Sequence, residues 1–250
     1  MTKKLVIVHG DKGGVGKSTF AGLTVDYFLE RTGKCVVVEG DKKIPDVASR
    51  FAGVSGVVGK IVDLARPDLS EEAIVALFSE IEKIGGDHVV INLPAGASST
   101  IDAQSEILYP AAHELGFEVC VFWLLGQEED SIRLLTESSL CQCADRKMVV
   151  INGHYGDFTR SFWWAHNFRP DWIQAEGMEG IFPDLTDRII RRVREMNGRY
   201  TDMVKHMDFT IIERQAVKRW IDKTWEGPIG FLLEDPETND TEEVTYATVG

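Results

Sequence analysis

Residues 11–19 read Asp11-Lys12-Gly13-Gly14-Val15-Gly16-Lys17-Ser18-Thr19. A short apolar run at residues 5–8 precedes them, and the apolar side chains of residues 17–30 recur with helical spacing. A glycine-rich turn between a strand and a helix suits a phosphate-binding loop, because glycines let successive backbone N–H groups face an anion. The helix N-terminus adds partial positive charge. The stretch therefore predicts that this loop holds the phosphates of a nucleotide.

Two side chains of the loop have individual roles in this prediction. Lys17 can reach the terminal phosphates, and the Ser18 hydroxyl can ligate Mg²⁺. The alternative is a glycine turn that carries a surface lysine. The strand–loop–helix context argues against that alternative, because it is the setting that a phosphate loop requires.

Apolar runs of strand length alternate with helical patterns along the first 150 residues. The later runs lie at residues 35–38, 88–91, 117–125 and 147–151. Strands that are buried on both faces read as continuous apolar runs, and alternation with helices implies parallel strands joined by right-handed crossovers. We predict an α/β fold with a doubly wound, mostly parallel sheet and helices on both faces.

The remaining segments have weaker signals. Residues 46–84 are expected to be helices, broken near residues 53–59 and at Pro67. Residues 178–182 are a candidate strand, and residues 184–196 and 201–225 have helical patterns. We therefore predict one domain over residues 1–225. An acidic, polar segment follows at residues 226–250 and is expected to be a loose tail.

The composition limits the function classes. The 250 residues carry a formal net charge of −13, which disfavours DNA and anionic lipid as partners. We expect weak or indirect DNA binding and no membrane partner. The N-terminus leads directly into a strand-like run without a signal-peptide pattern, so a cytoplasmic location is expected. Cys141 and Cys143 have no second Cys or His pair nearby at zinc spacing, so we predict no metal site there.

The loop has two further features. Lys12 stands five residues before Lys17, and Asp11 occupies the first position, where glycine is usual. In these respects the loop resembles the deviant Walker A motif of the ParA/MinD family, in which the early lysine is the signature. The resemblance implies a P-loop ATPase switch over residues 1–225 that binds ATP and ADP with Mg²⁺. It also implies a homodimer on ATP, in which Lys12 crosses to the partner's phosphates and acts with Lys17 in catalysis.

Residues 36–41, Val-Val-Val-Glu-Gly-Asp, resemble the family's strand that ends in Asp-x-Asp, with Glu39 in place of the first Asp. The resemblance implies that Asp41 positions or activates the attacking water and acts as a third catalytic residue. Asp is also common in turns, so a loop cap is the alternative for Asp41.

Residues 88–96, His-Val-Val-Ile-Asn-Leu-Pro-Ala-Gly, resemble the Walker B and switch II segment, with Asn92 in place of Asp. An asparagine can accept a hydrogen bond from metal-bound water but brings no charge. The predicted metal shell is therefore Ser18, Glu39 and Asn92, and we expect nucleotide binding with slow hydrolysis.

Two later segments resemble the adenine site of the family. Residues 148–152 end in Asn152, which the resemblance assigns to adenine recognition, and residues 181–183 place Pro183 beside the base. An Asn-Gly pair is also a favoured turn, so a turn role is the alternative for Asn152. The resemblance covers roughly residues 3–225.

The partner of the chain is less constrained. Six aromatic residues lie within residues 158–172 and predict either a protein-binding surface or a core segment. A cluster of arginines is interpreted as a solvated helix face or a weak DNA patch: Arg188, Arg191, Arg192, Arg194 and Arg199. The resemblance extends to accessory proteins of plasmid partition, mobilisation and conjugative transfer. The alternatives are an ATP-dependent small-molecule ligase on the same fold, which Lys12 disfavours, and a non-hydrolysing nucleotide-sensing scaffold, which Asn92 favours.

Overall fold

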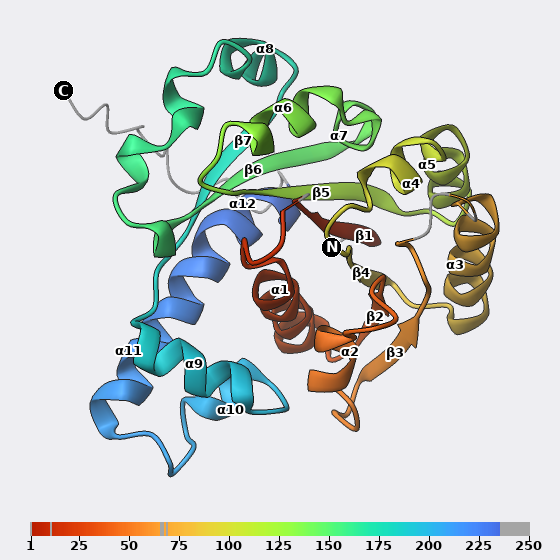
Figure 1. The fold of residues 1–250 in the computed structure, drawn as a ribbon. Helices are drawn as coiled ribbons and strands as arrows, with labels where there is room; N and C mark the ends of the chain where they lie inside the picture. Colours follow the sequence, from red (N-terminus) through yellow and green to blue (C-terminus); the bar gives the residue numbers. More distant parts are fainter. Residues whose placement is uncertain (1, 11, 66–67, 69, 236–250) are drawn as a thin grey trace.

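The apolar runs of the sequence form the strands of one sheet. The structure is a computed structural model that describes residues 2–10, 12–65, 68 and 70–235. The sheet has the order β3-β2-β4-β1-β5-β6-β7, and every neighbouring pair in it is parallel (Figure 1). The strands are β1 Lys4–His9, β2 Cys35–Glu39, β3 Val57–Ile61, β4 His88–Asn92, β5 Glu118–Leu125, β6 Arg146–Asn152 and β7 Met178–Phe182. The predicted doubly wound α/β fold is confirmed.

Helices cover both faces of the sheet (Figure 1). On one face lie α1 Lys17–Thr32, α2 Asp46–Arg50, α9 Asp187–Glu195, α10 Tyr200–Met203, α11 Ile211–Thr224 and α12 Gly230–Leu233. On the other face lie α3 Ser70–Ile84, α4 Ser98–Asp102, α5 Ser105–Glu114, α6 Asp130–Glu137, α7 Ser139–Cys143 and α8 Arg169–Gln174. Successive side chains of a strand point to opposite faces of the sheet. In β1, Val6 and Val8 therefore pack in the core on the α1 face, and Leu5 and Ile7 pack in the core on the α3 face.

The position of β1 in the sheet determines where a ligand can bind. The chain runs from β1 to β2 on one side and later crosses to β5 on the other, so the direction of winding changes at β1. In open α/β sheets, ligands bind outside the carboxyl ends of the strands at such a switch point. The glycine-rich loop follows the carboxyl end of β1 and therefore lies at this place.

Two expected helical segments are corrected by the structure. Residues 57–61 form the edge strand β3 and not part of a broken helix. The strand has one neighbour, and Val58 and Ile61 are largely exposed, so the residues do not read as a buried apolar run. The expected helix at residues 201–225 is divided into α10 and α11.

The expected boundary at residue 225 is too early. Ile229, Leu232 and Leu233 are fully buried in the core on the α1 face. Asp235 accepts a hydrogen bond of 3.0 Å from the Lys4 ammonium group. Partial burial would raise the pKa of Asp235, but the Lys4 contact holds it well below its ordinary value. The folded body therefore reaches residue 235, and the rest of the expected tail, 236–250, lies outside the described residues.

The helices of the described residues are too short or too polar to cross a membrane.

Candidate nucleotide site

The glycine-rich loop folds around the ammonium group of Lys17. Its Nζ donates hydrogen bonds of 2.7 Å to the carbonyl oxygens of Gly10 and of Lys12. Gly14 and Gly16 have φ angles of 79° and 100°, which favour glycine. A Cβ at Gly16 would also come within 2.9 Å of the Asn152 side-chain nitrogen. The turn thus needs its glycines, and Asp11 lies outside the described residues.

The predicted phosphate-binding residues line a cavity of about 450 Å³. Gly14, Gly16, Lys17, Ser18 and Thr19 form its loop side. The other lining residues come from α2 and from the end of α9 with the segment after it: Asp46, Val47, Ser49, Arg50, Arg194, Asn197 and Tyr200. The volume lies within the range of small-molecule sites. The cavity opens at the N-terminus of α1, where an anion is favoured.

Three residues that the sequence assigned to the metal lie together. Glu39 and Asn92 face each other on the paired strands β2 and β4. The Asn92 side-chain nitrogen donates to Glu39 Oε1 at 2.8 Å and to Ser18 Oγ at 3.4 Å. Among the described residues, Asn92 Oδ1 is buried and has no hydrogen-bond partner. A buried acceptor without a donor beside a serine hydroxyl fits a water molecule held by Mg²⁺.

Glu39 has a different environment from a typical metal carboxylate. Its side chain is fully buried, and Oε2 accepts a hydrogen bond of 2.9 Å from the backbone nitrogen of Val47. Burial raises the pKa of Glu39 to about 7, although the hydrogen bonds oppose the shift. Both oxygens hold other groups, so Glu39 orients Asn92 and the start of α2. Direct coordination of a metal by Glu39 remains a prediction.

Asp41 forms a turn. Its Oδ1 accepts hydrogen bonds from the backbone nitrogens of Lys43 at 2.8 Å and Ile44 at 3.0 Å. This is the loop-cap alternative. Asp41 is absent from the lining of the loop cavity, so its assignment to the attacking water remains a prediction.

Lys12 points to the start of α6 in its own chain. Its Nζ lies 3.4 Å from Glu128 and 3.7 Å from Asp130, and all three side chains are exposed by more than a third. Exposed ion pairs of this kind contribute about 0–1 kcal/mol. The side chain can therefore leave these partners at little cost.

The adenine-site residues are occupied with structural contacts. The Asn152 nitrogen donates to the Val15 carbonyl at 3.0 Å, and its Oδ1 accepts from the His154 backbone at 3.0 Å. The turn alternative for Asn152 is thus present, and the amide also supports the loop. An amide nitrogen has a second hydrogen to donate, so adenine recognition remains a prediction. The Pro183 carbonyl accepts a hydrogen bond of 2.8 Å from the Trp220 indole.

Two residues next to the loop, His9 and Tyr155, were not predicted from the sequence. Tyr155 donates from its hydroxyl to the Gly14 carbonyl at 3.0 Å. His9, at the end of β1, lies 2.9 Å from the Ser98 hydroxyl through Nε2 and packs edge-on against Trp123 at 4.6 Å. Ser98 follows the segment after Asn92 that resembles switch II, so His9 links the loop to that segment. The available signals were the position of His9, two residues before the loop, and that of Tyr155, three residues after Asn152.

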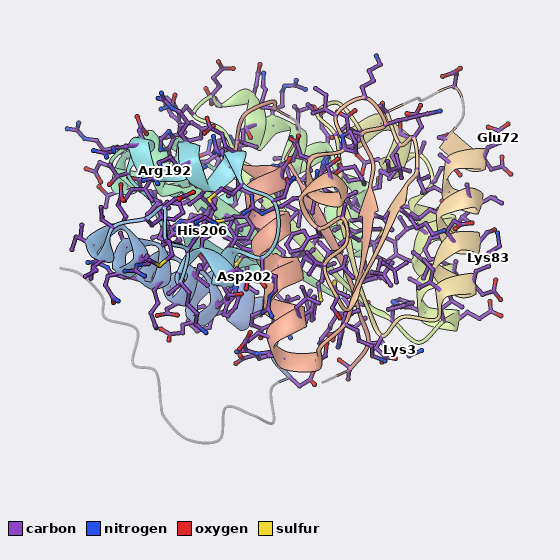
Figure 2. The ribbon with its side chains drawn as sticks, turned by 90° about the horizontal axis from the view of Figure 1, so that it is seen from below. Lys3, Glu72, Lys83, Arg192, Asp202 and His206 are labelled. Atoms are coloured by element: carbon purple, nitrogen blue, oxygen red, sulfur yellow. The ribbon has the colours of Figure 1, made fainter. Side chains whose placement is uncertain are left out.

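The arginine cluster does not form a continuous basic surface. Arg192 pairs with Glu213 at 3.1 Å, and Arg199 pairs with Asp26 and with Glu30 at 2.6 Å each. Figure 2 shows Arg192 at the same end of the molecule as Asp202 and His206. Charges of both signs are mixed there, which favours a solvated face over a DNA patch.

The aromatic segment is divided between the core and the surface. Trp163 and Trp172 are buried and pack edge-on at 6.1 Å, and the Trp163 indole donates to Glu179 at 2.6 Å. Phe162 is 59% exposed. The core interpretation therefore holds for these two tryptophans, and a protein contact through residues 158–172 remains a prediction.

The parallel sheet with a glycine-rich loop between β1 and α1 defines a P-loop nucleotide-binding fold. This fold is that of the cell division ATPase MinD of Pyrococcus furiosus, with a TM-score of 0.50 and 16% identity over 90% of this chain and 99% of that one. The chain is also 27% identical over 221 residues to protein MobD of Acidithiobacillus ferrooxidans. The aligned region covers 88% of this chain and 94% of the relative. No protein-family model matches. The expected likeness to MinD-type ATPases is confirmed for the fold.

Proposed function

We propose that the chain is a nucleotide-dependent switch that binds ATP and ADP with Mg²⁺, dimerises on ATP and hydrolyses ATP slowly. The observation that carries the proposal is the Lys17 ammonium group held inside the turn by the carbonyls of Gly10 and Lys12. It lies at the wall of a cavity that Ser18 and Thr19 also line. A cation and a helix N-terminus at one cavity are suited to a phosphate chain.

In this proposal, different residues bind the phosphates and the Mg²⁺ ion. The loop N–H groups and Lys17 would hold the phosphates, and Ser18 with the unpartnered Oδ1 of Asn92 would hold the water shell of Mg²⁺. Mg²⁺ would supply charge neutralisation at the phosphates. Glu39 keeps the Asn92 amide in one orientation through its hydrogen bond. Because Asn92 adds no negative charge to this shell, we expect binding to be retained and hydrolysis to be slow.

The dimer depends on Lys12 in this proposal. Its two exposed carboxylate partners bind it weakly, so ATP in a second subunit could take over the contact. Positive charge against the transferring phosphoryl group would then assist catalysis, as an arginine finger does.

The biological role we propose is plasmid partition or conjugative transfer, with a protein partner that contacts residues 158–172. The similarity to protein MobD is in keeping with a mobilisation role. DNA binding should be weak or indirect, because the arginines are largely paired with carboxylates. The second candidate is a nucleotide-sensing scaffold without hydrolysis, which the neutral Asn92 favours.

Light scattering with a non-hydrolysable ATP analogue tests the switch. The wild-type chain should be a dimer with the analogue and a monomer with ADP, and Lys12→Ala should remain a monomer. Lys43→Ala, at an exposed lysine outside the cavity, is the matched control and should dimerise. A monomer under every nucleotide condition would exclude the switch. A dimer with no phosphate release would favour the scaffold.

A further inference from the structure

The cavity beside the phosphate loop has a second wall that carries positive charge. Arg50 on α2 and Arg194 on α9 line the same cavity as Lys17. Three cations from three helices therefore meet at one cavity, whose lining includes one carboxylate, Asp46. The chain as a whole carries a formal charge of −13, so this concentration of positive charge is local.

Arg194 differs in its pairing from three other arginines of the cluster. On the same helix, Arg188 and Arg192 both lie within 4.0 Å of Glu213, and Arg199 is paired with Asp26. Across residues 2–10, 12–65, 68 and 70–235, no carboxylate forms an ion pair with Arg194. Its charge is therefore available for an anion that enters the cavity.

The charge of Arg194 reaches the loop. Burial raises the pKa of Tyr155, and the charge of Arg194 opposes that rise. The Tyr155 hydroxyl donates to the Gly14 carbonyl at 3.0 Å, so the group that feels Arg194 is bonded to the loop itself. Arg194 also opposes the pKa rise that burial causes at Tyr200, which lines the cavity.

Arg50 fixes the backbone on both sides of Arg194. Its guanidinium donates to the Val193 carbonyl at 2.9 Å, and its own carbonyl accepts from the Gly198 nitrogen at 2.7 Å. The guanidinium also stacks on the Tyr200 ring at 3.7 Å. The residues that flank Arg194 are thus clamped to α2, which limits where its side chain can reach.

We propose that Arg194 is an anion-binding residue of this cavity and contacts the phosphate chain of a bound nucleoside di- or triphosphate. The inference rests on the proposed function and adds a residue from the same chain to it. Arginine suits this role because its guanidinium can make paired hydrogen bonds to phosphate oxygens. Unlike Lys12, Arg194 would act in a single subunit, before any dimer forms.

Calorimetry with Mg²⁺-ADP tests the inference at a protein concentration where light scattering shows a monomer. Arg194→Gln should weaken ADP binding by roughly three- to ten-fold, the loss of one charge-assisted contact at an exposed position. Arg191→Gln is the matched control, because Arg191 is exposed on the same helix and does not line the cavity. This control should bind ADP as the wild type does.

Inorganic pyrophosphate, added as a competitor, identifies the part of the nucleotide that Arg194 contacts. Arg194→Gln should weaken pyrophosphate by the same factor as ADP. An effect on ADP alone would contradict the inference, because the contact would then be to the nucleoside. Equal binding by the wild type and Arg194→Gln would also overturn it, while loss of binding in Lys17→Ala would leave the proposed function standing. A wild-type chain that binds neither probe would exclude both.

Discussion

Strand β1 has a buried lysine near each end, and the two are held in different ways. Lys4, at its start, is fully buried between the carboxylates of Glu118 and Asp235. Lys17, in the loop region beyond its end, donates to backbone carbonyls. The contacts of Lys4 join the start of β1 to β5 and to Asp235, which stabilises the fold. The contacts of Lys17 place its ammonium group at the wall of the nucleotide cavity.

The same contrast extends along the sheet. We call the side where the parallel strands begin the amino edge, and the side where they end the carboxyl edge. At the amino edge, Arg146 donates to the carbonyls of Phe231 and Glu234 and so fastens α12 to β6. At the carboxyl edge, Asn92 has a free acceptor and Arg194 has no carboxylate partner among the described residues. Stability therefore depends mainly on one edge and ligand binding on the other, and the following variants test that division.

The largest effect is expected at the amino edge. A chain that ends at residue 225 should fail to fold, because it loses Ile229, Leu232 and Leu233 from the core. Each such loss costs about 2–5 kcal/mol, and the sum approaches the whole stability of a typical domain. A chain that ends at residue 235 is the control and should melt close to the wild type by circular dichroism. Cooperative melting of the shorter chain would contradict the assignment of residues 226–235 to the body.

Substituting Lys4 and Lys17 one at a time should separate the effect on stability from the effect on ADP binding. Lys4→Met should lower the free energy of unfolding by roughly 2–3 kcal/mol, because it leaves Glu118 and Asp235 without their cation. It should leave ADP affinity unchanged. Lys17→Ala should lower ADP affinity by about 100-fold and leave the unfolding curve nearly unchanged. Urea denaturation and calorimetry on both variants measure the two quantities, and a loss of both in either variant would remove the distinction between the edges.

A third, smaller effect concerns hydrolysis at the carboxyl edge. Asn92→Asp would place a second carboxylate against Glu39, where the two groups now lie 2.8 Å apart, so one of them would have to hold a proton. The double variant Asn92→Asp/Glu39→Gln keeps one hydrogen bond and adds the missing charge. We expect it to raise single-turnover ATP hydrolysis by about ten-fold or more, with Asn92→Asp between it and the wild type. Equal rates in all three proteins would show that Asn92 does not limit hydrolysis.

The smallest effect is a pH dependence at the amino edge. His88 stacks on Phe28 at 4.4 Å, and burial lowers its pKa to about 4 from 6.5. The folded state therefore keeps His88 neutral while the unfolded chain takes up a proton, so stability that is present above pH 6.5 is lost as the pH falls toward 4. Urea denaturation at pH 7 and pH 5 should show that His88→Phe removes about 1–2 kcal/mol of the wild-type loss. An unchanged pH dependence in His88→Phe would show that His88 does not cause this loss of stability.

Sequence reasoning succeeded where the signal was local. The strand, glycine turn and helix at residues 4–32 follow one another directly, so their order alone predicts the loop. Glu39 and Asn92 were assigned to one metal shell, and their meeting follows because the parallel strands β2 and β4 end at the same edge.

Prediction from the sequence failed where contacts between distant parts of the chain determine the structure. Strand β3 is short and exposed and is fixed by its pairing with β2. Residues 229–233 form a short apolar run just before acidic residues, and the acidic composition of residues 226–250 as a whole hid it. Three of its side chains meet a core built from α1, β6 and α11. The role of Arg194 depends on contacts between α2 and α9 that are about 140 residues apart, as with Arg50 and Val193.

The packing of His9 against Trp123 gives the protein an internal optical reporter. The Trp123 ring is fully buried, and its centroid lies 4.6 Å from that of the imidazole that ends β1. His9 in turn lies 2.9 Å from the Ser98 hydroxyl in the segment after Asn92. A rearrangement of the loop or of that segment on nucleotide binding that moves His9 would therefore change the surroundings of Trp123. The emission of one tryptophan, isolated by replacing the other five with phenylalanine, should therefore follow the state of the loop in real time without an added dye.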